Sequence, residues 1–223
     1  KKSFWTQKWT GFLALLFFII ATYNSGFSVD NKKPNSLVYI ENYDTKTAYF
    51  GTYNTTLDTY TKQIFKDDFT KGGIENAETK SKYNTPFNYT KKTAYKAISS
   101  SEIKTELDTL IGKKRFLELT ITPKRKINIL QFLTKSKLTL YQFKVNDELV
   151  NKGKKHSLKS GTFLVYRLGN NDKEVTLSFS VNVDQNLELT LNEVSYDLRT
   201  NKNFNLKPRA EDMMPMPFVT NDA

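Results

Sequence analysis

The sequence predicts a mainly β protein: an antiparallel β-sandwich of jelly-roll-like type, with one amino-terminal transmembrane helix and a short additional helix. Apolar and polar residues alternate with a period of two over much of residues 115–198, which is typical of strands with one solvent-facing side. Turn-forming residues separate these runs at short intervals, as they do in β-sandwiches. An uncharged, apolar segment at residues 9–29 predicts the transmembrane helix.

The apolar segment has the length and the flanks of a membrane span. Its centre, residues 12–21, is apolar throughout, with Trp5 and Trp9 at one end and Tyr23 near the other. A span needs about 20 mostly apolar residues, and aromatic rings favour the headgroup level. Basic residues without acids precede the segment, which places its start in the cytoplasm. We therefore expect residues 9–29 to contact a lipid bilayer and the carboxy-terminal domain to be extracytoplasmic, in a periplasmic or lumenal space.

The same segment also fits a secretory signal peptide. Lysines precede an apolar core of about eleven residues, and a polar exit follows it. No Ala-x-Ala-like cleavage site follows the core, because Tyr23, Asn24 and Phe27 stand where small residues are needed. This favours a retained helix. Both interpretations place the rest of the chain outside the cytoplasm.

We predict three segments along the chain. Residues 1–30 hold the transmembrane helix with its flanks, residues 31–198 form one β-sandwich domain, and residues 199–223 form an extended, Pro-containing tail. Within the domain, the stretch 66–101 is polar, with a Gly-Gly pair, scattered lysines and isolated aromatic residues. That composition predicts a long loop instead of a packed layer.

The individual elements follow from local patterns. The clearest alternation lies at residues 117–121, where Leu, Leu and Ile share one face. A short helix is predicted from Thr56 to Phe65, with Thr56 as its amino-terminal cap and Asp58 near the positive end of the helix dipole. Further strands are predicted at residues 36–40, 48–50, 127–133, 138–145, 163–168, 175–181 and 187–198.

The composition excludes several classes of protein. The chain has no cysteine, so it holds no disulfide and no thiolate zinc site. Its 34 Lys and Arg residues against 23 acids give a net charge of +11. These charges are dispersed along the chain, which is typical of a solvated surface. We therefore expect no nucleic-acid partner.

Candidate catalytic residues are scarce. His156 is the only histidine and lies in a Lys-rich loop, so it has no second histidine for a zinc site, and we expect it on the surface. No phosphate-binding Gly-rich loop, acidic calcium loop or His-Glu-x-x-His pattern is present. We therefore assign no catalytic, cofactor-binding or metal-binding residue within this chain.

Several segments resemble one enzyme family. Residues 33–65 are similar to the region that follows the last transmembrane helix in multi-spanning zinc aminopeptidases of metallopeptidase family 28, the relatives of the endoplasmic reticulum metallopeptidase and the vacuolar membrane protease. Residues 143–150 look like the hairpin of these proteins, in which a turn presents a short polar tip. Residues 206–215 resemble their closing Pro-Arg-Pro-x-x-Met-Met-Pro segment, with Ala210 where proline is more usual.

The resemblance implies a function for a parent protein and not for this chain alone. Enzymes of this family bind two zinc ions through His, Asp and Glu and use a Glu as general base, and one histidine cannot supply that set. The resemblance therefore implies a zinc-binding peptidase domain upstream of Lys1. This chain would then be the last span plus a non-catalytic extracytoplasmic domain, with the upstream peptidase domain of the same polypeptide as its partner.

Loops on a rigid scaffold are the usual place for binding contacts, and three groups of residues are candidates for such a surface. They are the hairpin tip Asn146 and Asp147, the basic run Lys124, Arg125 and Lys126, and the aromatic loop residues Tyr83, Phe87 and Tyr89. The alternative function is a stand-alone membrane-anchored or secreted β-sandwich module that binds sugar or peptide, which the composition fits equally well. In the tail, we expect Arg209 to pair with Glu211 or another carboxylate as the segment docks on the sheet.

Overall fold

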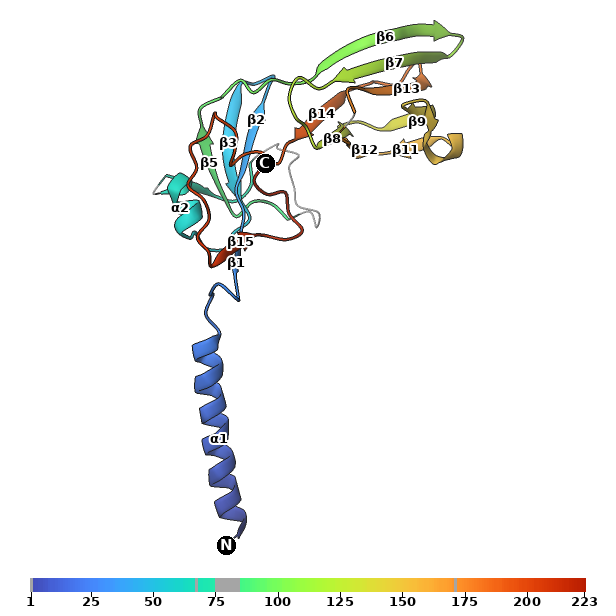
Figure 1. Cartoon of the computed structure of the whole chain (residues 1–223). Helices are drawn as coiled ribbons and strands as arrows, with labels where there is room; N and C mark the ends of the chain where they lie inside the picture. The colour runs from blue at the N-terminus through green and yellow to red at the C-terminus, as the bar shows by residue number, and fades with distance from the viewer. Residues whose placement is uncertain (1, 67, 75–84, 171) are drawn as a thin grey trace. The chain divides into compact units, whose positions relative to one another are not determined.

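The computed structural model describes residues 2–66, 68–74, 85–170 and 172–223 (Figure 1). The fold is mainly β, as predicted, and its chain divides into two compact units. Unit 1 comprises residues 1–40, 49–93 and 202–222, and unit 2 comprises residues 41–48, 94–201 and Ala223. Residues 31–198, predicted as one β-sandwich domain, contribute to both units. The end of the chain returns to the residues near its start, and these segments bury apolar side chains of their own.

Unit 1 contains two small sheets. A four-stranded sheet has the order β2-β3-β5-β4, and a separate pair joins β1 to β15 in parallel. Its elements are α1 (Lys2–Asn24), β1 (Lys33–Asn35), β2 (Val38–Asn42), β3 (Thr47–Thr52), α2 (Thr59–Phe65), β4 (Thr70–Lys71), β5 (Tyr89–Thr93) and β15 (Met213–Pro215). Buried Val38, Tyr53 and Phe87 form one apolar cluster, against which Met216 and Val219 of the tail pack.

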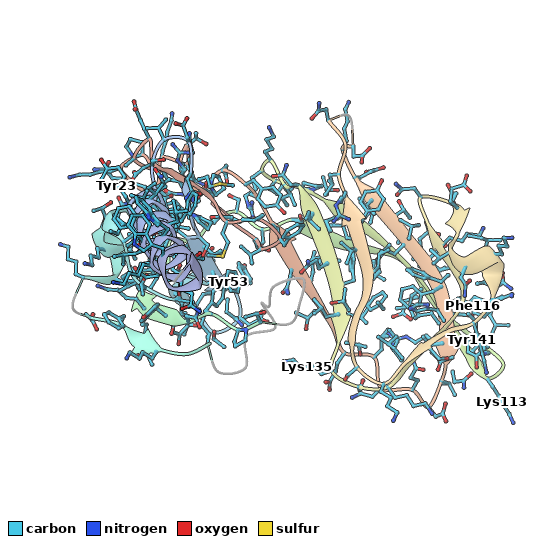
Figure 2. All side chains as sticks on the ribbon, turned by 90° about the horizontal axis from the view of Figure 1, so that it is seen from below. Tyr23, Tyr53, Lys113, Phe116, Lys135 and Tyr141 are labelled. Carbon is cyan, nitrogen blue, oxygen red and sulfur yellow. The ribbon has the colours of Figure 1, made fainter. Side chains whose placement is uncertain are left out.

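Helix α1 is present, but its predicted role as a membrane span is not supported. Every described side chain of α1 is exposed, including Tyr23 (Figure 2). Among the helices in the described ranges, none combines the length and the apolar character needed to cross a membrane. The continuous apolar run 12–21 rises only about 15 Å, against a hydrocarbon core of about 30 Å. Polar residues, Lys8 and Asn24 among them, occupy the two ends of the helix.

The short additional helix is confirmed, with a later start than predicted. Helix α2 begins after Asp58 and not after Thr56. The Asp58 carboxylate accepts the backbone N–H of Thr61 at 2.9 Å, and the Thr61 hydroxyl accepts the backbone N–H of Asp58 at 2.9 Å. This reciprocal capping box satisfies two donors that a helix start otherwise leaves unpaired, which fixes the first turn at Thr59.

The stretch 66–101 is not the continuous loop that its composition predicts. It contributes β4 and β5, and β5 lies between β3 and β4 in the four-stranded sheet. Figure 1 shows β5 in the same sheet as β2 and β3. The residues of β5 are almost all polar, with Thr90 buried and Lys92 exposed. Polar strands of this kind carry no apolar alternation, so the period-two pattern could not identify β5.

Unit 2 is built from two antiparallel sheets. The first has the order β10-β9-β13-β7-β6, with β11 also paired to β9, and the second has the order β12-β8-β14. Its elements are β6 (Glu102–Ile111), β7 (Lys114–Thr122), β8 (Ile129–Thr134), β9 (Leu138–Val145), β10 (Glu148–Leu149), the 3-10 helix η1 (Val150–Gly153), β11 (His156–Leu158), β12 (Gly161–Arg167), β13 (Val175–Asn182) and β14 (Leu189–Val194).

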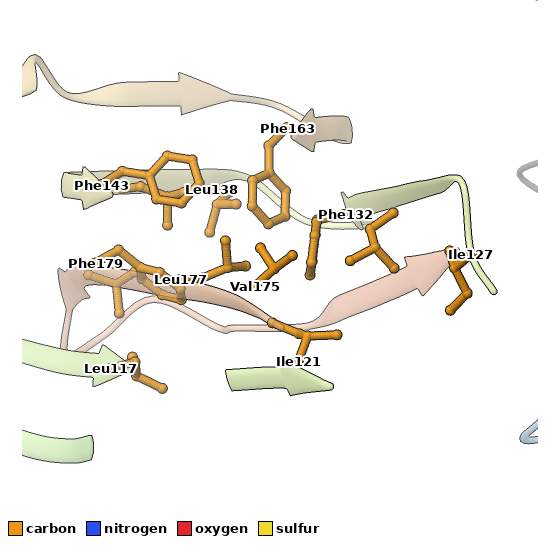
Figure 3. Close-up of a cluster of buried hydrophobic side chains, with 13 residues drawn as sticks. Leu117, Ile121, Ile127, Phe132, Leu138, Phe143, Phe163, Val175, Leu177 and Phe179 are labelled. Carbon is orange, nitrogen blue, oxygen red and sulfur yellow. The ribbon is translucent and has the colours of Figure 1, made fainter. Parts of the chain in front are cut away.

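One apolar core joins the two sheets of unit 2 (Figure 3). Leu177 and Phe179 of β13 and Phe143 of β9 come from the first sheet, while Phe132 of β8 and Phe163 of β12 come from the second. The predicted strands at 117–121, 127–133, 138–145, 163–168 and 175–181 all correspond to these elements. Strand β6 was not predicted, because its side chains are nearly all exposed and its sequence mixes charges with isolated apolar residues.

Candidate functional site

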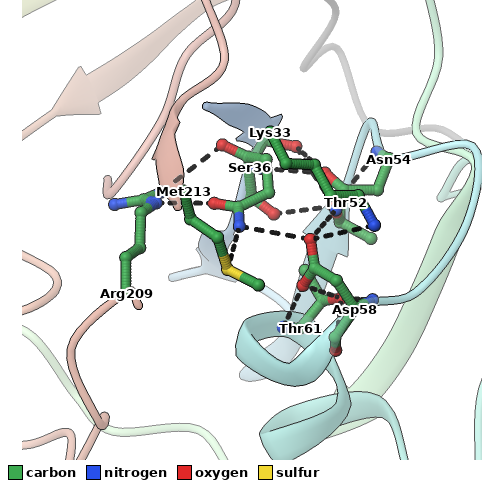
Figure 4. A network of polar contacts seen from close by, with 9 residues as sticks. Lys33, Ser36, Thr52, Asn54, Asp58, Thr61, Arg209 and Met213 are labelled. Atoms are coloured by element: carbon green, nitrogen blue, oxygen red, sulfur yellow. Dashed lines mark hydrogen bonds and ion pairs between the residues drawn. The ribbon is translucent and has the colours of Figure 1, made fainter. Parts of the chain in front are cut away.

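The most elaborate polar arrangement in the described part of the chain lies in unit 1 around Asp58 (Figure 4). The Asp58 side chain is only 4% exposed. One carboxylate oxygen accepts the side-chain amides of Asn35 and Asn54, each at 3.2 Å, and the other accepts two donors of Thr61 at 2.9 Å. Lys33 Nζ lies 3.8 Å away. A buried carboxylate is costly unless it is paired, and here the negative charge is met by donors on both oxygens.

Arg209 forms the second centre of this network. Its side chain is 5% exposed, and its guanidinium donates two bonds to the Asp222 carboxylate, at 2.5 and 2.8 Å. It also donates to Asn35 Oδ1 at 2.5 Å, while its Cζ lies 4.4 Å from the centre of the Tyr60 ring. Arg209 was predicted to pair with Glu211 or another carboxylate, and the partner is Asp222. Two parallel hydrogen bonds restrict the orientation of the guanidinium relative to the carboxylate, so this pair holds the tail in place.

Asn35 connects the two centres. Its amide nitrogen donates to Asp58 and to Met213 Sδ, while its amide oxygen accepts from Arg209. Its backbone carbonyl accepts the side-chain amide of Asn221 at 2.9 Å. The parallel pairing of β1 with β15 places Met213 opposite Lys33, two residues before Asn35. One buried amide therefore links segments that are distant in the sequence. No local pattern predicted this role for Asn35 or Asp222.

The arrangement is suited to holding the fold and not to proton transfer. Its carboxylates, those of Asp58 and Asp222, are both engaged by amides, hydroxyls or a guanidinium. A shallow depression beside it is lined by Thr59, Tyr60, Gln63 and residues 207–210. Within the described ranges, no group of three or more His, Asp or Glu side chains is placed so that it could hold a metal ion.

The hairpin tip, which the sequence analysis proposed as a binding surface, forms the turn between β9 and β10. Asn146 and Asp147 both have positive φ, 49° and 67°, and both are exposed. The Asn146 side chain accepts the backbone N–H of Thr176 at 2.8 Å and donates to the Tyr166 hydroxyl at 3.0 Å. Asn146 therefore holds the turn against β12 and β13, while Asp147 presents its carboxylate to solvent.

The basic run is largely engaged within unit 2. Lys124 pairs with Glu102 at 2.5 Å, and this contact lowers the pKa of the Glu102 carboxyl through a hydrogen bond and through charge attraction. Arg125 donates to Glu193, to the Ser99 carbonyl and to the Ser195 hydroxyl. Lys126 is exposed. The three residues are neighbours on one loop, but the Arg125 side chain is hydrogen-bonded to Ser99, Glu193 and Ser195.

The aromatic loop does not form one exposed surface. Phe87 is 2% exposed and belongs to the core of unit 1, with its ring 4.5 Å from that of Tyr53. Tyr89 is half-buried, and its hydroxyl donates to the Thr55 carbonyl at 2.9 Å. Tyr83 lies outside the described residues. Phe87 is thus a packing residue, which an isolated aromatic in a polar stretch could not indicate.

His156, predicted on the surface, is half-buried at the start of β11. Its ring lies 6.4 Å from the ring of Phe143, at the margin of the apolar core of unit 2.

Comparisons with protein-family models, with curated proteins and with solved structures return no match for this chain.

Proposed function

We propose that this chain is the non-catalytic, extracytoplasmic carboxy-terminal domain of a membrane-embedded zinc aminopeptidase, whose upstream domain hydrolyses peptides. The observation that supports this proposal is the network around Asn35. The segments that resemble the peptidase family, residues 33–65 and 206–215, are far apart in sequence, yet Asn35 bonds to both Asp58 and Arg209. A chance similarity would not be expected to gather its residues at one buried site.

The remaining segment that resembles the peptidase family, residues 143–150, lies in unit 2. Residues 143–150 cover the end of β9, a tight turn and β10, with Asn146 and Asp147 at the tip. For unit 2 we propose an antiparallel β-sandwich of jelly-roll-like type. The support is the single apolar core that receives side chains from both sheets. Such a scaffold can position a catalytic domain or cover part of its cleft.

For localisation we propose a membrane protein with this domain on the extracytoplasmic side, and a lipid bilayer as the partner of residues 9–29. The described side chains of α1 are exposed on every face, and they include Trp9, Phe17 and Ile19. The central run of α1, residues 12–21, is apolar on every face, and we propose that a bilayer supplies the apolar environment that such a run favours.

Zinc belongs to the upstream domain in this proposal. A catalytic zinc site takes three protein ligands and leaves one position open for water. The chain has a single histidine, and the acids of the Asn35 network are already paired, so its described residues do not fit a zinc site. In this proposal the residues of this chain hold and orient the upstream domain, and that domain carries out the hydrolysis.

The native gene product provides the direct test. An antibody against this domain should detect a membrane-extracted species much heavier than the 25.8 kDa of this chain. That species should release amino-terminal residues from peptides and lose this activity with a zinc chelator. A band at or below 25.8 kDa, without such activity, would instead support the stand-alone binding module.

A pair of variants in the full-length protein tests the non-catalytic role. Arg209→Ala should reduce the amount of folded protein, because it removes the bidentate pair with Asp222, but kcat per folded enzyme should stay unchanged. Arg199→Ala removes an exposed side chain of the same type and serves as the control. A loss of kcat with a normal level of folded protein would contradict the proposal.

A further inference from the structure

Unit 2 carries a cluster of lysines that the proposed function does not use. They lie in the turn between β8 and β9 and on either side of β11. Their side chains are exposed, and among the described residues none of them takes part in an ion pair: Lys135, Lys137, Lys152, Lys154, Lys155 and Lys159. We call these six residues the lysine patch.

The strand register brings the members of the patch together. Strand β11 pairs antiparallel with β9, and the pairing ends with Leu158 opposite Leu138, so Lys159 and Lys137 both lie just beyond this end of the pairing. Strand β12 pairs with β8, with Gly161 opposite Thr134, which brings the turn that holds Lys159 beside Lys135. Figure 2 shows Lys135 at the margin of unit 2. Residues far apart in sequence thus form one positive surface.

This juxtaposition is unfavourable without a partner. Like charges that lie close together repel each other, and Lys159 and Lys137 flank the same end of the β9–β11 pairing. The adjacent loop between β13 and β14 holds only two acids, Asp184 and Glu188. Glu188 accepts a hydrogen bond from Asn186 at 2.9 Å. The patch therefore stays positive and offers a site to a polyanion.

Hydroxyl groups lie between the charges. Thr139 and Ser157 face each other across β9 and β11, with their hydroxyls 3.1 Å apart, and both residues lie between the Lys137–Lys159 pair and Lys155. Side chains that alternate along a strand point to the same face at every second residue, so Lys137 and Thr139 share a face. Ammonium and hydroxyl groups together are suited to phosphate oxygens.

We infer that the lysine patch binds the phosphate headgroups of an anionic lipid surface. The choice of a lipid surface rests on the proposed bilayer contact of α1, because a helix in the bilayer keeps the rest of the chain at high effective concentration near the headgroups. Each lysine near an anionic membrane contributes about fivefold to binding. Stable attachment commonly needs two such signals, one apolar and one basic.

The test uses the full chain and two sets of vesicles, phosphatidylcholine alone and phosphatidylcholine mixed with phosphatidylglycerol. The patch variant replaces Lys135, Lys137, Lys155 and Lys159 with Gln. The control variant replaces four exposed lysines of unit 1 with Gln and changes the net charge equally: Lys62, Lys71, Lys92 and Lys202. Binding is measured by flotation, and folding of each variant by circular dichroism.

On anionic vesicles, the patch variant should bind at least about tenfold more weakly than the native chain, while the control should stay within about twofold. Added salt should remove the difference, because it screens exposed charges. Equal losses in both variants would overturn the inference, since net charge alone would then explain binding. Full competition by inorganic phosphate, or binding to heparin but not to anionic vesicles, would also overturn the lipid assignment.

The two proposals fail in different ways. Neutral vesicles report the bilayer contact of α1, and Phe17→Asp with Ile19→Asp should abolish binding there. Absence of any binding to neutral vesicles would contradict that contact. The patch variant against its control on anionic vesicles reports the lysine patch alone, and its loss of affinity would stand whether or not α1 binds.

Discussion

The two units of this molecule are stabilised in different ways. Unit 2 has an apolar core shared by two sheets, with Phe143, Leu177 and Val175 fully buried. Unit 1 also buries apolar side chains, but its distant segments are joined by a buried polar network around Asn35, Asp58 and Arg209. Apolar packing tolerates small shifts, whereas buried charges need their partners in place. The comparison suggests that unit 1 is the part that depends on its tail.

The largest expected effect is in the core of unit 2. Phe143→Ala removes a fully buried ring that packs against Phe163 and Phe179, with ring centres 6.0 and 6.2 Å away. We expect the free energy of unfolding of unit 2 to fall by about 3–5 kcal/mol. Hydrogen exchange of the unit 2 amides measures this change. Ile111→Ala, at a side chain that is 64% exposed, is the control and should change stability by less than about 0.5 kcal/mol.

In unit 1 the matching change is Arg209→Ala. It removes the guanidinium from the Asp222 carboxylate and the Arg209 donor from Asn35 Oδ1, so unit 1 should lose about 3 kcal/mol of unfolding free energy. Hydrogen exchange should increase in β1 and α2 but not in the core of unit 2. Arg115→Ala breaks the exposed pair with Asp108 and should cost at most about 1 kcal/mol. Equal effects of the two substitutions would show that burial of the Arg209 pair is unimportant.

The two units also differ in how far the sequence predicted them. In unit 2, Leu117, Leu177 and Phe179 alternate with polar residues, so the strands could be located from the pattern alone. Strand β6 was not predicted, because an edge strand without a buried face does not need apolar residues at every second position. Periodicity therefore predicts strands only where one face is covered.

In unit 1 the decisive contacts are between single polar residues far apart in the chain. The cap Asp58 was recognised as belonging to a helix start, but its bonds to Asn35 and Asn54 depend on tertiary structure. Arg209 was correctly expected to meet a carboxylate, while Asp222 was not identified as the partner. Pairings of this kind follow no fixed spacing in the sequence. The sequence therefore predicted that Arg209 binds a carboxylate, but it could not identify which residue supplies that carboxylate.

Close packing in unit 1 provides a test of intermediate size. A Cβ atom added at Gly51 of β3 would lie 2.9 Å from the ring of Phe87, which is 2% exposed and cannot easily move. Gly51→Ala should therefore lower the stability of unit 1 by about 1–3 kcal/mol. Gly26→Ala, where nothing lies within 4 Å, is the control. Chemical denaturation of both variants measures the change in the free energy of unfolding. No change in Gly51→Ala would mean that the Tyr53–Phe87 cluster is loosely packed.

The smallest effect concerns Tyr53, in the same cluster. Burial raises the pKa of its hydroxyl from 10.0 to about 12, and that hydroxyl has no hydrogen-bond partner among the described residues. Tyr53→Phe removes a desolvated, unpaired group and should stabilise unit 1 by about 1 kcal/mol at neutral pH. Tyr89→Phe, which removes the bond to the Thr55 carbonyl, should have the opposite sign.

The pH dependence gives the Tyr53 prediction a second, independent measurement. Above pH 10 the unfolded state releases the Tyr53 proton while the folded state retains it up to about pH 12, so folding stability falls as pH rises through this window. Tyr53→Phe lacks that proton, and its advantage over the native chain should therefore widen between pH 10 and about pH 12 and then level off. A constant advantage would mean that the hydroxyl is hydrated in the folded state. The buried cluster of unit 1 would then admit water at its apolar centre, and its stability would depend even more on the polar network.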